Sequence, residues 1–153
     1  MADLIILSGI PGAGKSTFIK NYKWNRPIIV LSTDAIRKYL TGDASNLEKD
    51  SEVWKFVYEA LEHPFKEATY IVDATNLVAK RRKSYLKYKD NFDSIKLYCL
   101  LVDLEVALER NEQRSRHVPE GVIINMHESL KKNMDIDDLI QAGYDEVRFI
   151  ANN

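Results

Sequence analysis

Five short apolar runs alternate with amphipathic segments along this chain. Apolar runs of about 4–8 residues between turn-forming residues are typical of buried strands. The predicted strands are residues 3–8, 27–31, 70–73, 95–102 and 146–150. The segments between them carry apolar residues at helical spacing. The predicted helices are residues 15–23, a short one from about 34, 50–67 (with Pro64 bending or splitting it), 78–90, 104–114, 119–132 and 135–141.

This alternation predicts an α/β fold of three layers, with a five-stranded parallel sheet between helices. Ligands of such sheets collect beyond the carboxyl ends of the strands. Four polar features fall at predicted strand ends, and we expect them to form one site. They are the glycine-rich segment 9–17, Asp34, the segment 73–76 and the stretch after residue 102.

The segment 9–17 reads Gly-Ile-Pro-Gly-Ala-Gly-Lys-Ser-Thr and matches the phosphate-binding pattern G-x-x-x-x-G-K-[ST]. A predicted strand precedes it and a predicted helix follows it, which is the context that the motif requires. Its backbone N–H groups would surround the phosphates of ATP. Lys15 would contact the β- and γ-phosphates, and Ser16 would bind Mg²⁺. The expected nucleotide-binding residues are Gly9, Pro11, Gly12, Ala13, Gly14, Lys15, Ser16 and Thr17.

Composition narrows the class of protein. The chain has 153 residues, which predicts a single domain over 1–153, and a formal net charge of −1, which provides no global attraction to nucleic acid or membrane. The single cysteine excludes an intramolecular disulfide. We see no signal peptide and no run of membrane-spanning length, so we expect a cytoplasmic protein. No Asn-Lys-x-Asp element of a guanine-specific GTPase is present. A small phosphotransferase fits best.

Asp34 and Arg37 follow the second predicted strand. A carboxylate at this position can take the proton of an attacking hydroxyl and orient its oxygen toward the γ-phosphate. Arg37 lies three residues further, on nearly the same helix face, and can bind a phosphate of the acceptor. The alternative is a surface ion pair at a helix start. The position at a strand end beside the phosphate loop favours the functional interpretation.

Asp73, Thr75 and Asn76 end the third predicted strand. Asp73 is placed like the acid that orders Mg²⁺ or its waters in nucleotide-binding sites. Thr75 and Asn76 can donate hydrogen bonds to a substrate phosphate. The competing interpretation is a turn, because all three residue types bond readily to their own backbone.

Two arginine-rich stretches are candidate anion sites. Arg110 and Arg114 are four residues apart on a predicted helix, and a bound triphosphate would neutralise their mutual repulsion. We expect both in a helical lid over about 110–122, with Arg116 undecided. The second stretch is the basic run 80–89, which has Tyr85 and Tyr88 interleaved and can follow a phosphate backbone. A solvated charged helix face explains this run more simply.

In this order and spacing, the motifs resemble those of the 5′-hydroxyl polynucleotide kinases of phage and bacterial RNA-repair type. These are P-loop phosphotransferases of adenylate-kinase-like architecture. The resemblance extends from residue 9 to about 132. The matching elements are 9–17, Asp34 with Arg37, 73–77, Arg110 with Arg114, and Val118-Pro119. Some members carry Asp directly before the Thr-Asn pair, where this chain has Ala74, so the role of Asp73 stays open.

The resemblance implies a stand-alone, ATP- and Mg²⁺-dependent kinase that phosphorylates the 5′-hydroxyl of DNA or RNA. Asp34 would be the general base, and Lys15, Arg110 and Arg114 would surround the donor phosphates. Arg37 and Thr75 would hold the 3′-phosphate of the acceptor. Val118 would lie near the acceptor base. Two alternatives remain: a kinase of a small molecule (a sugar, an antibiotic or a nucleoside) and a non-catalytic nucleotide-binding module.

Overall fold

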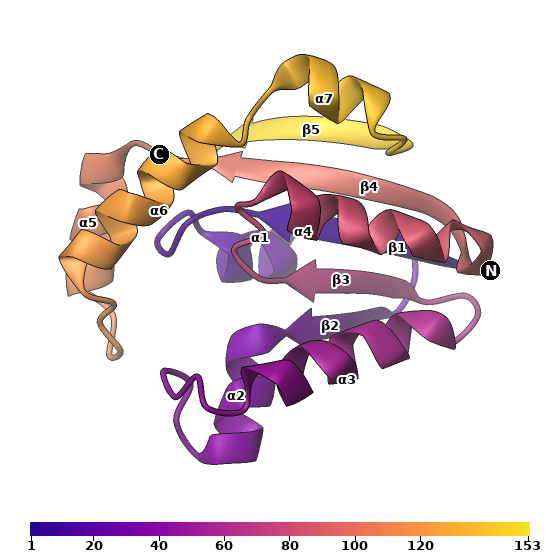
Figure 1. Cartoon of the computed structure of the whole chain (residues 1–153), viewed down its shortest axis with the longest axis horizontal. Helices are drawn as coiled ribbons and strands as arrows, with labels where there is room; N and C mark the ends of the chain where they lie inside the picture. Colours follow the sequence, from indigo (N-terminus) through magenta and orange to yellow (C-terminus); the bar gives the residue numbers. More distant parts are fainter.

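The computed structural model describes all residues, 1–153, and consists of a five-stranded parallel sheet between helices (Figure 1). The strands stand in the order β2-β3-β1-β4-β5. Consecutive parallel strands need a crossover connection, and helices supply it here. The strands are β1 (Ala2–Ser8), β2 (Ile28–Ser32), β3 (Thr69–Asp73), β4 (Phe92–Leu101) and β5 (Glu146–Ala151).

The helices agree with the predicted segments, except for two boundaries. They are α1 (Lys15–Asn21), α2 (Thr33–Thr41), α3 (Asp50–Glu62), α4 (Ala79–Ser84) continued by the 3₁₀ segment η1 (Tyr85–Asn91), α5 (Leu104–Glu112), α6 (Glu120–Lys132) and α7 (Ile136–Gln141). No helix combines the length and the apolar character that a membrane span requires.

Two predicted helix boundaries were wrong. The helix predicted over 50–67 neither bends nor splits at Pro64 but ends at Glu62. A proline disfavours the helical conformation of the residue before it, so the helix stops short of His63. The helix predicted over 78–90 is divided into α4 and η1 at Tyr85. The periodicity of the sequence does not distinguish these tighter turns from an α-helix.

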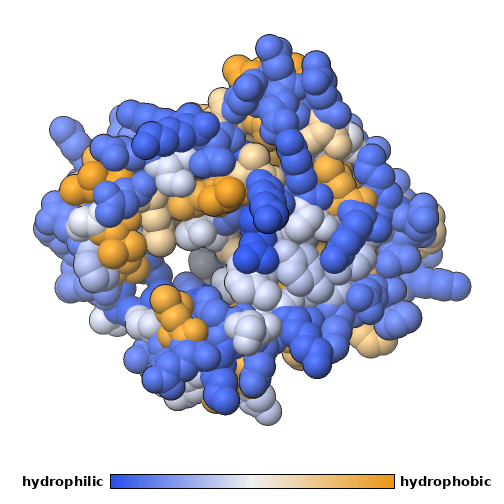
Figure 2. Space-filling view, viewed as in Figure 1, coloured by the Kyte–Doolittle hydropathy of each residue, from blue (hydrophilic) through white to orange (hydrophobic).

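The surface over α3 and α4 is mainly hydrophilic, and it is hollowed between α2 and the α5–α6 region (Figure 2). In Figure 1, β1, β2 and β3 end beside this hollow. The arrangement therefore brings the carboxyl ends of three strands to one opening.

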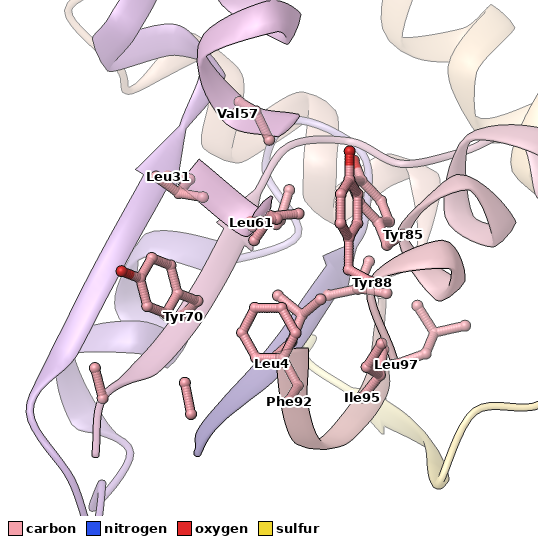
Figure 3. Close-up of a cluster of buried hydrophobic side chains, with 14 of the residues drawn as sticks. Leu4, Leu31, Val57, Leu61, Tyr70, Tyr85, Tyr88, Phe92, Ile95 and Leu97 are labelled. Carbon is pink, nitrogen blue, oxygen red and sulfur yellow. The ribbon is translucent and has the colours of Figure 1, made fainter. Parts of the chain in front are cut away.

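Successive residues of β1 point to opposite faces of the sheet, and both faces are buried. Leu4 and Ile6 belong to the core cluster that packs under α3, η1 and α7 (Figure 3). Ile5 and Leu7 belong to the cluster on the other face, with residues of α1, α5 and α6. A strand buried on both faces shows a continuous apolar run, which is why β1 is recognisable in the sequence.

Candidate active site

A large cleft of about 900 Å³ lies at the carboxyl ends of the central strands. It contains most of the residues predicted to act there, although they lie up to more than 100 positions apart in sequence. These are Pro11, Gly12, Gly14, Lys15, Ser16, Thr17, Asp34, Arg37, Asp73, Thr75, Arg110, Arg114 and Val118. Ala13 is fully buried behind the loop, and Gly9 is buried as well. Asn76 does not line the cleft.

Glycines shape the phosphate loop because the backbone turns where a side chain has no room. Gly12 and Gly14 have φ of +87° and +86°, in the left-handed region that favours glycine. A Cβ on Gly12 would also lie 2.7 Å from the backbone oxygen of Ala107. The loop is therefore pressed against α5, with its concave side toward the cleft.

Lys15 lies under this loop and donates hydrogen bonds to the backbone oxygens of Gly9 (2.7 Å) and Ile10 (3.2 Å). Burial lowers the pKa of Lys15 to about 8, against the opposing influence of Asp73 and Asp34. Burial also raises the pKa of Asp73, although Lys15 counteracts this shift. Since phosphates would favour the charged lysine, this cation is poised for an anionic ligand.

Asp34 begins the first turn of α2, directly after β2. The Ser32 hydroxyl caps this helix by accepting from the Ala35 N–H (3.2 Å), which sets the direction of the turn. One carboxylate oxygen of Asp34 accepts from Arg37 at 2.8 Å, and the other accepts from Arg116 at 3.1 Å. The side chain is 53% exposed, so it is held in place and still accessible from the cleft.

Arg37 is buried and binds several partners at once. Its Nε and Nη2 donate to both oxygens of Asp50 (2.7 and 3.1 Å), and Nη1 donates to Asp34 and to the Ala44 carbonyl. These four bonds leave one of the five guanidinium N–H groups uncommitted. In this structure Arg37 positions Asp34, and its predicted contact with an acceptor phosphate stays a prediction that this one donor can serve.

Asn76 has a different place from the expected one. It is 3% exposed, and its amide donates to the Leu7 carbonyl (2.6 Å) and accepts from the Tyr85 hydroxyl (2.7 Å). The Ser8 hydroxyl in turn donates to the Asn76 carbonyl (2.9 Å). Both polar groups of the Asn76 side chain are thus used by the fold. The predicted hydrogen bond from Asn76 to a substrate is not supported, and the residue instead ties the end of β1 to the loop after β3.

The basic run 80–89 also divides into different roles. Arg82 is fully buried and donates to the carbonyls of Leu77 (2.8 Å), Asn76 (3.2 Å) and Asn133. Lys83 pairs with Asp138 at 2.5 Å. Arg82 therefore supports the loop that carries Asp73 and Thr75, which a count of basic residues in the sequence does not reveal.

The lid consists of the end of α5, the loop after it and the start of α6. Asn111 closes this loop by donating to the Val118 carbonyl (2.7 Å) and accepting from its N–H (2.9 Å). Arg110 donates to the Gly12 carbonyl (3.0 Å), and Arg114 faces the cleft. Arg116 reaches across to Asp34 and to the Ser45 hydroxyl (3.2 Å). The lid thereby connects the phosphate loop with the opposite wall.

Several site residues were not predicted from the sequence. Asp50 orients Arg37, Asn111 holds the lid, and Asn152 donates to the Ala13 carbonyl of the phosphate loop (2.6 Å). Trp54 lines the cleft from α3. Only Asn111 carried a usable signal, since it stands between Arg110 and Arg114 on the helix that was singled out. The others come from segments with no motif.

The residues present fit a nucleotide with Mg²⁺. The phosphate loop, Lys15, the exposed Ser16 and the half-buried Asp73 line the same cleft, so a cation, a hydroxyl and a carboxylate are available to phosphates and their metal. No group of three or more His, Cys, Asp or Glu side chains is arranged to hold a metal by itself. Mg²⁺ commonly binds through one or two protein oxygens together with substrate phosphates, which suits this arrangement.

Strand order, loop and lid together define a P-loop kinase fold. A family model, AAA_33 (AAA domain), matches residues 4–133. The protein belongs to this family. It is also 35% identical over 135 residues to an L-seryl-tRNA(Sec) kinase of Methanococcus maripaludis, a match that covers 82% of this chain and 51% of the relative. The chain thus spans about half the length of that curated relative.

Solved structures show the same fold at low sequence identity. A chain of the Pnkp1/Rnl/Hen1 RNA repair complex superposes with a TM-score of 0.71 at 20% identity, over 86% of this chain and 45% of that one. Chaetomium thermophilum Kti12, solved with ADP-AlF3, has a TM-score of 0.64 at 13% identity over 97% and 88%. Shikimate kinase from Bacteroides thetaiotaomicron has 0.59 at 16% identity over 95% and 85%.

Proposed function

We propose that this chain is an ATP-dependent phosphotransferase that phosphorylates a hydroxyl at the 5′ end of a nucleic acid. The observation that carries the proposal is the position of Asp34. This carboxylate is held by arginines from two walls of the cleft and shares the cleft with the phosphate loop and Lys15. A nucleotide-binding module has no need of a carboxylate fixed in this way.

The charges of the cleft suit two phosphate-bearing substrates. Six cationic side chains and three carboxylates line it, although the whole chain has a net charge of −1. The cations are Lys15, Arg37, Lys38, Arg110, Arg114 and Arg116, and the carboxylates are Asp34, Asp50 and Asp73. In a site with restricted water, such donors stabilise the charge of a transferring phosphoryl group.

In the proposed reaction, Asp34 accepts the proton of the acceptor hydroxyl while the oxygen of that hydroxyl forms a bond to the γ-phosphorus of ATP. The bond from that phosphorus to the β–γ bridging oxygen breaks, and ADP leaves. Lys15, Arg110 and Arg114 neutralise the phosphoryl oxygens, and Arg37 and Thr75 hold the acceptor. Ser16 and Asp73 would hold Mg²⁺, which supplies further charge neutralisation on the phosphates.

A second candidate acceptor is the serine hydroxyl of an aminoacylated tRNA. The 35% identity to an L-seryl-tRNA(Sec) kinase, over 82% of this chain, favours it. Both candidates are alcohols carried by a nucleic acid. Asp34 and the phosphate loop can serve either acceptor. The part of the cleft that contacts the rest of the acceptor therefore determines which of the two is phosphorylated.

Transfer of labelled phosphate from ATP to a panel of acceptors tests the proposal. The panel contains 5′-hydroxyl oligoribonucleotides, 5′-hydroxyl oligodeoxyribonucleotides, seryl-tRNA, and the polyols gluconate and shikimate. We expect label on the 5′-hydroxyl oligonucleotides. Label on seryl-tRNA alone supports the second candidate, and label on a polyol alone makes the chain a small-molecule kinase. No transfer to the oligonucleotides or to seryl-tRNA, from a folded protein that binds ATP, contradicts both nucleic-acid candidates.

A further inference from the structure

The eight arginines of the chain differ in what they bind. Arg26, Arg37, Arg116 and Arg148 pair with carboxylates, and Arg82 and Arg110 donate to backbone carbonyls. Arg114 faces the phosphate side of the cleft. Arg81 is the one arginine outside that cleft with neither a carboxylate within 4 Å nor a carbonyl partner. Its guanidinium is nevertheless held in a defined place.

Arg81 lies flat against α3. Its guanidinium carbon is 3.8 Å from the centre of the Trp54 ring, and Nη1 donates to the Tyr58 hydroxyl at 2.8 Å. The Tyr58 hydroxyl also bonds to Ser84 (2.7 Å), and Ser84 donates to the Arg81 carbonyl (2.6 Å). This network fixes the guanidinium but uses only one of its five N–H groups. The remaining donors form a preorganised fork suited to a phosphate.

Arg81 lies next to the cleft, on the side formed by α3. Asp50, Trp54 and Tyr58 are four residues apart on α3, so each lies about 6 Å further along the helix. Asp50 and Trp54 line the cleft. Beyond them, the Lys87 ammonium lies 5.1 Å from the rings of Tyr58 and Tyr88, again with no carboxylate within 4 Å. In Figure 1, α3 and the α4–η1 segment run side by side, and these residues lie along their contact.

We propose that Arg81, stacked on Trp54, binds a backbone phosphate of the acceptor strand beyond its reacting nucleotide, with Lys87 further along the same path. The inference rests on the proposed function and specifies its substrate as a single strand longer than one nucleotide. Aromatic rings on which bases stack and cations that contact the backbone are the features that bind single strands without reading their sequence.

Kinetics with acceptors of two lengths test this subsite. The acceptors are a 5′-hydroxyl decanucleotide and a nucleoside 3′-monophosphate, compared in the wild type, Arg81→Ala and Arg81→Lys. We expect Arg81→Ala to raise the ratio of KM(decamer) to KM(mononucleotide) about tenfold, because one charge-assisted phosphate contact is lost. The logarithmic salt dependence of decamer binding should fall by about 0.7, the value for one phosphate on a single strand. Arg81→Lys should recover part of the ratio, and the exposed Lys80→Ala serves as the matched charge control.

An unchanged KM ratio and salt dependence in Arg81→Ala overturns the subsite and leaves the proposed function standing. Equal losses with both acceptors have the same meaning, since they show that Arg81 only supports the fold. A direct measurement of strand binding distinguishes failure of the subsite from failure of the proposed kinase reaction. In a Trp24→Phe variant, Trp54 is the single tryptophan. Binding of the decamer should quench the Trp54 fluorescence in this variant, but not when Arg81→Ala is added. Quenching without any phosphate transfer contradicts the proposed kinase reaction and supports the subsite.

Discussion

At the scale of single residues, the structure separates side chains that act in the cleft from side chains that hold it. Asp34 and Lys15 face the opening, whereas Asn76 and Arg82 are buried behind it. All four are polar residues near strand ends or in charged segments, so their sequence contexts look alike. Their roles differ because Lys15 and Asp34 line the cleft, whereas Asn76 and Arg82 do not line it and bond to buried parts of the fold.

Replacing Asp34 by Asn should abolish most of the phosphate transfer. The amide keeps the size of the side chain but is a poor proton acceptor, and general-base catalysis contributes about 10²–10⁴-fold. We expect kcat to fall by that factor in single-turnover assays, with ATP affinity nearly unchanged. Glu52→Gln, an exposed neutralisation on α3, is the control. Full activity of Asp34→Asn contradicts its role as base and favours a nucleotide-binding module.

Nucleotide affinity should weaken as the pH rises above 8. The pKa of Lys15 is about 8 because of burial, whereas phosphates favour its charged form. Binding therefore takes up a proton above pH 8, and the loss of affinity should approach about tenfold per pH unit. Calorimetry of ATP binding from pH 7 to pH 9.5 measures it. Lys15→Arg should remove the dependence in this range, since arginine stays charged.

The same lowered pKa affects folding with a definite sign. Between pH 8 and the ordinary value of 10.5, the unfolded chain holds more protons on Lys15 than the folded chain. The contribution of this group to stability therefore increases as the pH rises through that window. An affinity of the wild type for ATP that does not change between pH 7 and pH 9.5 would show that the Lys15 pKa is not lowered.

Asn76→Ala should destabilise the protein without touching the ligands directly. The change leaves the Leu7 carbonyl and the Tyr85 hydroxyl without their partner, and it places alanine at a φ of +45°. We expect a loss of about 2–4 kcal/mol in the free energy of unfolding by urea denaturation. Asn25→Ala, at an exposed residue, should change stability by less than about 0.5 kcal/mol. If Asn76→Ala also lowers the free energy of unfolding by less than about 0.5 kcal/mol, the structural role of Asn76 is contradicted.

At the scale of elements, the lid is a small two-helix unit closed by one side chain. Asn111 on α5 makes both of its hydrogen bonds to Val118, just before α6. The arginines between these residues reach the phosphate loop side and α2 only while the loop keeps this shape. The function of the lid therefore depends on a buried amide rather than on the arginines alone.

Asn111→Ala should loosen the lid. Without the two hydrogen bonds from Asn111 to Val118, the loop samples open conformations. The KM values for ATP and for the acceptor should therefore both rise several-fold. Limited trypsin digestion should cut more quickly after Arg114 and Arg116. The matched control is Asn91→Ala, because Asn91 makes a similar clasp from η1 to Leu61 and Glu62, far from the lid. Equal proteolysis rates in the two variants would assign the lid shape to other contacts.

The elements also show which sequence signals were reliable. All five strands were predicted, with bounds that differ by up to three residues, because each is a short apolar run between turn-forming residues. The motif residues Lys15, Asp34 and Arg110 were brought to one cleft, as the strand-end rule implied. The division of the helix at Tyr85 and the places of Asp50 and Asn152 depend on contacts between distant segments, so no local pattern encodes them.

At the scale of the whole molecule, the cleft is a meeting point of segments from all parts of the chain. The phosphate loop follows β1, Asp34 follows β2, Asp73 ends β3, and the lid follows β4. Asn152, after β5, bonds to the phosphate loop. A ligand that bridges these segments must stabilise the fold as a unit.

Mg²⁺ with ATP should raise the thermal midpoint of the protein. At 100 times the dissociation constant, a ligand adds about 2.7 kcal/mol, which for a chain of this size corresponds to roughly 5–10 °C. Differential scanning calorimetry with and without Mg²⁺, and with EDTA, measures the shift. Lys15→Met should remove most of it, whereas Lys20→Met, exposed on α1, should keep it. No shift in the wild type would contradict nucleotide binding at the phosphate loop.

The sequence by itself determined the alternation of strands and helices, the phosphate loop and the strand-end acids, because these depend on local periodicity and on a contiguous motif. Only the tertiary structure decided that Asn76 and Arg82 support the site, that Arg116 and Arg37 hold Asp34 from two sides, and that Arg81 lies on Trp54 at the edge of the cleft. These roles are set by burial and by partners far away in sequence, and both exist only once the sheet and its helices have packed.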